Sequence, residues 1–263
     1  MNGKTAVITG ASSGIGLALA RLMVREGYTV YNLSRRDAGT EGVRHISTDV
    51  TSTESVKNAV EEILSREKKI DVLVSNAGYG ISGAIENTAE EDALRQLDVN
   101  FYGLFRISKA VLPIMRKQRQ GKIIAISSVA GAISIPFQTM YSVSKAAINS
   151  YVMALANEVR PFGIKVAAVL PGDARTNFTM AREKNETDDS EYRERLDKSV
   201  AGMEKDEQNG MTPEYVASRI YRVIRKKSPK PMTVVGVKYK VFTVLFKILP
   251  SRFANWVVGK LYA

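Results

Sequence analysis

Residues 4–16 read Lys-Thr-Ala-Val-Ile-Thr-Gly-Ala-Ser-Ser-Gly-Ile-Gly, an apolar run that leads into a glycine-rich turn. A helical pattern of apolar residues follows to about Glu26, and Gly27 ends it. A turn of this kind gathers backbone N–H groups at the positive end of the helix dipole, which suits an anion such as a pyrophosphate. The alternative is a plain tight turn between a strand and a helix. The strand before the turn and the helix after it favour a nucleotide site.

The spacing of these glycines is Gly10-x-x-x-Gly14-x-Gly16. It differs from the Gly-x-Gly-x-x-Gly of the common dinucleotide fingerprint. It is not a Walker loop either, because no Lys-Ser or Lys-Thr pair follows the last glycine.

Strand and helix patterns alternate along the rest of the chain. Strand-like apolar runs recur at residues 28–34, up to 46, at 70–75, 122–127 and 165–170, with helical patterns between them at 53–66, 90–118 and 138–160. This alternation predicts an α/β fold with a parallel sheet and helices on both faces. Pro113 is expected to bend or divide the helical region 90–118. Residues 181–210 are densely charged and are expected to form a mobile excursion above the sheet, before Thr212-Pro213 starts another helix.

Composition excludes several kinds of site. The 263 residues suit one α/β domain with at most a small appendage, and the absence of cysteine excludes disulfides and thiolate metal sites. The single histidine, His45, makes a histidine-based triad or a multi-histidine metal centre hard to build, so we expect no metal. No signal-peptide pattern opens the sequence, and the apolar stretches fall short of the ~18 residues that a spanning helix needs. We therefore expect a cytoplasmic protein.

The stretch Tyr141-Ser142-Val143-Ser144-Lys145 places a phenol and an ammonium four residues apart, on one face of a predicted helix. A free tyrosine titrates near pKa ~10, and a nearby cation favours the phenolate, so we expect Lys145 to lower the pKa of Tyr141. Such a tyrosine could give and take a proton near neutral pH. The pattern Tyr-x-x-x-Lys is common by chance, so it is informative only together with the other motifs of the chain.

Taken together, these motifs resemble those of the short-chain dehydrogenase/reductase family over about residues 4–235. The glycine turn and the Tyr-x-x-x-Lys stretch match its two main motifs, and further matches follow in the correct order: Asp49-Val50, Asn76-Ala77-Gly78, Asn100, Ser128 thirteen residues before Tyr141, and Pro171-Gly172 with Thr176. The family's pattern is Asn-Asn-Ala-Gly, and Ser75 replaces its first Asn. Ala174 stands where the family often has a branched aliphatic residue. The resemblance implies a doubly wound, Rossmann-type sheet of seven parallel strands.

The resemblance also implies catalytic roles for Asn100, Ser128, Tyr141 and Lys145. Tyr141 would be the general acid in carbonyl reduction and the base in alcohol oxidation, while Lys145 would also hold the nicotinamide ribose. Ser128 would donate a hydrogen bond to the substrate oxygen, where charge builds in the transition state. Asn100 would anchor a water in the proton relay. Ser127 is the alternative to Ser128, and the spacing to Tyr141 favours Ser128.

The end of the second strand bears on the choice of cofactor. Enzymes that use NAD usually carry Asp or Glu there, whereas this strand ends in Ser34-Arg35-Arg36. Guanidinium groups suit a 2′-phosphate, so we expect NADP(H) in preference to NAD(H); the alternative is that both arginines are solvated loop charges. The expected cofactor contacts are Gly10, Ser12, Ser13, Gly14, Ile15, Gly16, Ser34, Arg35, Arg36, Asp49, Val50, Asn76, Ala77, Gly78, Tyr141, Lys145, Pro171, Gly172 and Thr176.

The C-terminal part of the chain carries the whole charge excess. Residues 215–263 hold eleven of the 38 Lys and Arg residues and none of the 27 Asp and Glu residues, so the remaining 27 basic residues match the acids before them. We divide the chain into a dinucleotide-binding catalytic domain, residues 1–236 with a substrate loop at 173–211, and a basic apolar extension at 237–263. Residues 238–263 suit peripheral membrane contact; the alternatives are a helix packed on the domain and a subunit interface. Nucleic acid is disfavoured, because the cations alternate with large aliphatic residues.

Residues 132–137 are apolar and lie just before the Tyr-x-x-x-Lys stretch, which suggests a lipid-like or polycyclic substrate. In this respect the chain resembles hydroxysteroid and retinol dehydrogenases and acyl-dihydroxyacetone-phosphate reductase. We expect an NADP(H)-dependent oxidoreductase, a homo-oligomer as in many relatives, that interconverts a ketone and a secondary alcohol on an apolar molecule. The alternative is a non-catalytic NADP-binding sensor or scaffold of the same fold, which the presence of all four catalytic residue types disfavours.

Overall fold

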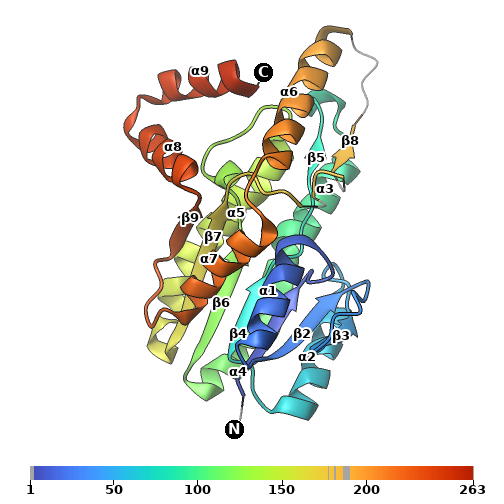
Figure 1. The fold of residues 1–263 in the computed structure, drawn as a ribbon, viewed down its shortest axis with the longest axis vertical. Coiled ribbons are helices and arrows are strands. Elements are labelled where there is room, and N and C mark those ends of the chain that lie inside the picture. Colours follow the sequence, from blue (N-terminus) through green and yellow to red (C-terminus); the bar gives the residue numbers. More distant parts are fainter. Residues whose placement is uncertain (1–2, 177, 181, 186–189, 263) are drawn as a thin grey trace.

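A sheet of parallel strands runs through the centre of the computed structural model, which describes residues 3–176, 178–180, 182–185 and 190–262 (Figure 1). Within these residues the sheet has seven strands in the order β3-β2-β1-β4-β6-β7-β9, and the chain order reverses between β1 and β4. The strands are β1 (Thr5–Thr9), β2 (Thr29–Ser34), β3 (Val43–Ser47), β4 (Val72–Ser75), β6 (Gly121–Ile126), β7 (Ile164–Pro171) and β9 (Met232–Val235). The expected doubly wound sheet is confirmed.

Helices cover both faces of the sheet. They are α1 (Gly14–Arg25), α2 (Thr53–Glu67), α3 (Glu90–Leu97), α4 (Gly103–Gln118), α5 (Thr139–Glu158), α6 (Ser190–Gln208), α7 (Pro213–Arg225), α8 (Val237–Ile248) and α9 (Ser251–Tyr262), with short 3₁₀ turns at Ile85–Asn87, Val129–Gly131 and Arg160–Phe162. Alternate residues of a strand point to opposite faces. Ala6 and Ile8 accordingly pack in the core that includes α1 and α7, while Val7 packs in the core that includes α2, α4 and α5.

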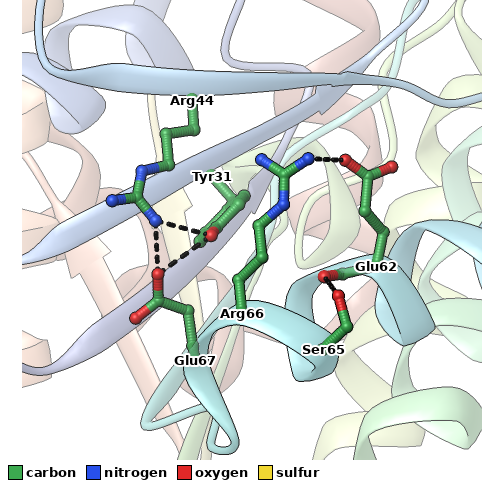
Figure 2. Close-up of polar contacts among 6 residues, drawn as sticks. All are labelled: Tyr31, Arg44, Glu62, Ser65, Arg66 and Glu67. Carbon is green, nitrogen blue, oxygen red and sulfur yellow. Dashed lines mark hydrogen bonds and ion pairs between the residues drawn. The ribbon is translucent and has the colours of Figure 1, made fainter.

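A polar cluster ties the β2–β3 edge of the sheet to the end of α2 (Figure 2). The hydroxyl of Tyr31 donates to Glu67 Oε1 at 3.0 Å, and Arg44 donates to the Tyr31 hydroxyl at 2.8 Å and also to Glu67. Beside it, Arg66 and Glu62 form an ion pair at 2.7 Å along the helix. These contacts hold β2 and β3 against the C-terminal end of α2.

The helical region 90–118 is interrupted at a different place from the one expected. The break is a turn of π-helix at Asp98–Tyr102, between α3 and α4, whereas α4 continues through Pro113. A π-turn inserts an extra residue into the helix and re-aims the side chains around it. It places Asn100 in the interior, as described below.

Residues 181–210, expected to form a mobile excursion above the sheet, contain regular secondary structure over most of their described length. Glu183–Lys184 (β8) pairs with Ile81–Ser82 (β5) in a second, two-stranded sheet, and Ser190–Gln208 forms α6. Leu196, Val200 and Met203 lie on one face of α6 and are buried against a small core that includes Phe137. The charged residues that suggested a mobile loop cover the other faces of this helix. Residues 186–189 lie outside the described residues.

The C-terminal extension forms two helices, α8 and α9. Together with α6 they gather at the end of the molecule opposite the N-terminus (Figure 1). Tyr262, at the end of α9, packs with the cluster around α6, and its carbonyl accepts a hydrogen bond from Ser199. Within the described residues, no helix is both long enough and apolar enough to cross a membrane.

Candidate active site

The glycine turn after β1 is packed so closely that side chains would not fit. Gly10 has φ +67°, and a Cβ atom there would approach Ala77 Cα to 2.8 Å. A Cβ atom on Gly16 would lie 2.5 Å from both the carbonyl oxygen of Gly10 and Nδ2 of Asn76. Asn76 holds the turn from the end of β4, donating to the carbonyls of Thr9 at 3.2 Å and Gly10 at 2.9 Å. The sequence motif Asn76-Ala77-Gly78 is therefore part of the turn's support.

The start of α1 offers N–H groups to an anion. Ser13 is the residue before the helix, and its side chain makes no capping hydrogen bond to the first turn. The first-turn N–H groups are consequently free of a side-chain cap, and the positive end of the helix dipole adds to them. Ser12, Ser13, Gly14 and Ile15 line a cavity at this point. The closely packed glycines and the uncapped helix start fit the pyrophosphate of a dinucleotide.

The end of β2 presents two guanidinium groups to the same cavity. Ser34 donates to the carbonyl of Arg36 at 2.7 Å and so shapes the turn, while Arg35 and Arg36 are exposed and line the cavity. Neither arginine forms an ion pair within the part of the chain that the structure describes. Asp37 instead accepts a hydrogen bond from the backbone N–H of Gly39 at 3.0 Å. The guanidinium groups are thus available to an anionic group of a ligand.

Asp49 and Val50 follow β3 and line the cavity on the same side. Asp49 Oδ1 accepts hydrogen bonds from the backbone N–H of Thr51 at 2.9 Å and from its hydroxyl at 2.7 Å. These bonds, chiefly the backbone one, lower the pKa of the Asp49 carboxyl. The carboxylate is therefore fixed and ionised beside the cavity.

Tyr141 and Lys145 lie one turn apart on α5, as expected, and both are nearly inaccessible to solvent, at 9% and 5% exposure. The ammonium nitrogen of Lys145 lies 5.5 Å from the centroid of the Tyr141 ring and donates to the carbonyl of Ile126 at 3.1 Å. Both side chains line the cavity. The ring of Phe178 packs against Tyr141, with the centroids 5.4 Å apart.

The pKa values of Tyr141 and Lys145 shift in opposite directions, because burial disfavours the charged form of each group. Burial raises the pKa of Tyr141 to about 12; a hydrogen bond from Ser128 opposes this shift, and the charge of Glu207 adds to it. Burial lowers the pKa of Lys145 to about 8. The expectation that Lys145 lowers the pKa of Tyr141 is therefore not met in this structure. Lys145 is directed to a backbone carbonyl and lies near the ring, and its charge is itself destabilised by burial.

Ser127 and Ser128 occupy different roles at the end of β6. The hydroxyl of Ser127 donates to the carbonyl of Lys145 at 3.1 Å and so ties the strand to α5. The Ser128 oxygen accepts from the N–H of Ala130 at 3.1 Å, lines the cavity and lies within hydrogen-bonding reach of Tyr141. Because the Ser127 hydroxyl is committed to the backbone, the geometry favours Ser128 as the group that meets a substrate.

Asn100 is buried behind the cavity wall and does not line the cavity itself. Its amide bonds to both backbone groups of Tyr79, each at 3.0 Å, and to the hydroxyl of Ser144 at 3.0 Å. A Cβ atom on Gly78 would lie 3.0 Å from Asn100 Oδ1 and 3.6 Å from Lys145 Nζ. Asn100 therefore positions the segment at Gly78 and Tyr79, next to Lys145.

One continuous cavity of about 990 Å³ joins these groups. Of the residues expected from the sequence, all but Gly16 and Asn100 line it, including Pro171, Gly172 and Thr176 after β7. The opposite wall comes partly from α6, which lies within the expected substrate loop 173–211, and partly from α8 and α9, to which the sequence analysis assigned no part of a cavity. A signal for the α8 part was present, because the residues that line the cavity recur three and four positions apart, at Lys238, Phe242 and Leu245 in α8 and at Leu249 just after it.

Carboxylates lie on the polar part of this wall. Burial raises the pKa of both Asp173 and Glu207, and the charges of both act on Tyr141. Glu207 pairs with Arg182 and accepts from the hydroxyl of Thr179 at 2.5 Å, while Asp173 accepts from the hydroxyl of Tyr239 on α8. Asp206 also lines the cavity. The cavity thus has an acidic region near Tyr141 and an apolar region under α8 and α9.

Comparison with known proteins gives consistent matches. The family model described as short chain dehydrogenase matches residues 4–187. A 3-ketodihydrosphingosine reductase of Bacteroides thetaiotaomicron is 41% identical over 267 aligned positions, covering 100% of this chain and 99% of the relative.

Solved structures agree with these matches. A short-chain dehydrogenase from Streptomyces avermitilis has a TM-score of 0.85 at 31% identity and covers 98% of this chain and 97% of its own. An alcohol dehydrogenase from the archaeon Thermococcus sibiricus, solved with 5-hydroxy-NADP, has a TM-score of 0.72 at 26% identity and covers 90% of this chain and 97% of its own.

Proposed function

This chain belongs to the short-chain dehydrogenase family of oxidoreductases, and on that premise we propose that it reduces the ketone of an apolar, lipid-like substrate with NADPH. The same site would catalyse the reverse oxidation of the secondary alcohol. The observation that carries the proposal is the meeting of Tyr141, Ser128 and the glycine turn in one cavity. The alternative is a non-catalytic sensor or scaffold. It is disfavoured because none of the four catalytic residue types is missing.

In this proposal Tyr141 is the proton donor. With a pKa of about 12 its hydroxyl is protonated at neutral pH, which is the state that carbonyl reduction requires. Ser128 donates a hydrogen bond to the carbonyl oxygen as negative charge builds there. Lys145, with a pKa of about 8, exchanges protons readily near neutral pH and can resupply Tyr141. A nicotinamide cofactor, when bound, supplies the hydride.

That cofactor would bind at the start of α1 and at the residues that follow β2 and β3. The pyrophosphate would meet the start of α1, and Asp49 and Val50 would flank the adenine, as the family resemblance implies. Arg35 and Arg36 support a preference for NADP(H), because a 2′-phosphate would pair with guanidinium groups that have no ion-pair partner in the described residues.

For the substrate we propose a long-chain ketone of the 3-ketodihydrosphingosine type. The full-length match to a reductase of that name supports it, as does the apolar cavity wall formed by α8 and α9. A molecule of this type carries an amine on the carbon next to its ketone. The carboxylates of Asp173 and Asp206 line the cavity and suit an ammonium group at that position. Phe242, Leu245 and Val258 suit the hydrocarbon chain.

Two further parts of the proposal concern partners. Residues 238–263 carry five cations and no acid, which supports peripheral contact with an anionic membrane. Tyr102, Phe105, Val143 and Met153 are exposed apolar side chains around α4 and α5, which supports a homo-oligomer through that face.

The direct test is a rate measurement with a panel of ketones. The panel holds 3-ketodihydrosphingosine, a ketone of equal chain length without the amine, and a short soluble ketone, each with NADPH and with NADH. We expect the amino ketone with NADPH to give the highest kcat/KM. Asp206→Asn should reduce its advantage over the amine-free ketone, while the matched Asp197→Asn on α6 should not. Binding of NADPH without turnover of any ketone would instead favour the sensor or scaffold.

A further inference from the structure

Helices α8 and α9 each carry two apolar stripes that face different ways. The inner stripe lines the cavity and includes Phe242 and Leu245 on α8, Leu249 just after it, and Val257, Val258 and Leu261 on α9. The outer stripe of α8 does not line the cavity and is exposed at Val237, Val241, Val244 and Ile248, spaced three and four residues apart. Phe253 and Trp256 continue this exposed surface on α9, with ring centroids 5.8 Å apart in a stacked pair. We call these six residues the outer apolar face.

Cations border the outer apolar face. Lys240, Lys247, Arg252 and Lys260 are exposed, and none of them forms an ion pair within the residues that the structure describes. No acid occurs anywhere in residues 215–263. An exposed apolar face with an aromatic pair and flanking cations matches the chemistry of an interface between anionic lipid headgroups and acyl chains. A second copy of the same face would bring positive charge against positive charge.

The apolar rim of the cavity belongs to the same two helices. Among the large apolar side chains that are exposed in the described residues, those that also line the cavity are Phe242, Leu245 and Leu261. All three lie on α8 or α9. The cavity therefore reaches the surface through an apolar mouth beside the outer apolar face. An apolar chain could enter the cavity through this mouth.

We infer that α8 and α9 dock the protein on an anionic lipid surface through the outer apolar face, and that the lipid ketone enters the cavity from that surface through the mouth at Phe242, Leu245 and Leu261. The docking stands on the exposed residues alone, whereas the route of entry rests on the proposed function. Each helix has 12 residues and lies along the interface, with its inner stripe toward the protein and its outer stripe toward the lipid.

The docking is tested by flotation with vesicles of phosphatidylcholine, with and without phosphatidylglycerol. We expect the full-length protein to float with the anionic vesicles and to be released by high salt. The double variant Ile248→Ser/Trp256→Ser removes side chains that are 71% and 58% exposed, and should partition at least about tenfold more weakly. Its matched control is Ile85→Ser/Leu94→Ser, at 56% and 57% exposure away from these helices, which should bind as the unmodified protein does.

The route of entry is tested with the same variants and two substrates, a long-chain ketone held in anionic vesicles and a short soluble ketone. Ile248→Ser/Trp256→Ser should lose about tenfold in rate on the vesicle substrate and stay within about twofold on the soluble one, because neither residue lines the cavity. Failure of the unmodified protein to bind anionic vesicles, or equal loss with both double variants, overturns the docking. Equal rates for both double variants on vesicles overturn the route. Absence of turnover with every ketone contradicts the proposed function and leaves the flotation result to decide the docking.

Discussion

At the scale of single residues, the site depends on two buried groups that are both held neutral more readily than in water. Tyr141 and Lys145 share one face of α5, and burial moves their pKa values apart, to about 12 for Tyr141 and about 8 for Lys145. The pairing could be predicted from their spacing of four residues. The direction of the tyrosine shift could not, because it depends on the depth of burial and on Glu207, which α6 brings to the site from 66 positions along the chain.

Lys145 makes the stability of the cofactor-free protein depend on pH. Its pKa is about 8 in the folded state and near its ordinary 10.5 when unfolded, so the folded state binds fewer protons between these values. Stability should therefore rise with pH across this window, by at most about 3 kcal/mol, and the term is absent in Lys145→Met. Urea unfolding of both proteins between pH 7.5 and 10 measures the difference. Parallel curves for the two proteins would show that Lys145 keeps an ordinary pKa.

Arg35 and Arg36 give the second prediction at this scale. Replacing both by alanine removes charge-assisted hydrogen bonds to a 2′-phosphate, so the KM for NADPH should rise about tenfold or more while the KM for NADH stays the same. Arg21→Ala, an exposed arginine on α1 that does not line the cavity, is the control. Equal changes in the KM values for NADPH and NADH would mean that the two arginines do not bind the 2′-phosphate.

At the scale of elements, the strands and the glycine turn could be predicted because local sequence determines them. Val72, Leu73 and Val74 form an unbroken apolar run, which identifies a strand buried on both faces. Helix α6 could not be predicted, because Leu196, Val200 and Met203 are isolated in a charged segment and gain their partners only from the folded structure. The cavity-lining residues of α8 do recur at helical spacing, but that spacing does not show which face of the helix meets the domain, so this wall was missed.

The contact between Tyr239 and Asp173 gives a prediction about α8. The ring of Tyr239 packs on Gly172, where a Cβ atom would lie 2.2 Å from it, and its hydroxyl donates to Asp173. Tyr239→Phe keeps the ring but removes the donor, which loosens the first turn of α8 over the cavity. We expect the KM for a long-chain ketone to rise several-fold, by about 1 kcal/mol, with little change for a short ketone.

The matched control for that prediction is Tyr215→Phe, at an exposed tyrosine on α7 whose hydroxyl accepts from Arg219 at 3.0 Å. It should leave both KM values unchanged. If Tyr239→Phe behaves like this control with the long-chain ketone, the hydroxyl contact does not hold α8 in place.

At the scale of the whole molecule, two sets of exposed apolar side chains suit different partners. The face at Phe105 and Val143, on α4 and α5, lies in the part of the chain whose charges balance, whereas the outer apolar face lies in the basic extension. A second copy suits the former and anionic lipid suits the latter. The balance of charge was readable from the sequence, but which side chains gather on each face required the fold.

The native mass measured by light scattering shows which of the two faces joins copies of the chain. We expect a native mass that is a multiple of the 28.9 kDa chain, and a 28.9 kDa monomer for Phe105→Glu/Val143→Glu, because charges buried in that interface would repel each other. The variant Ile248→Ser/Trp256→Ser should keep the native mass of the unmodified protein. A monomer from the second variant, with an intact oligomer from the first, would exchange the two assignments.

The most direct test of the account is ketone reduction by Tyr141→Phe with NADPH bound. This change removes the hydroxyl and keeps the ring that packs against Phe178. We predict a loss of about 10²-fold or more in kcat, because the proton donor is gone, with NADPH affinity measured by fluorescence within about twofold of the unmodified protein. Turnover at the unmodified rate, with NADPH bound as tightly, would contradict the assignment of Tyr141 as the acid.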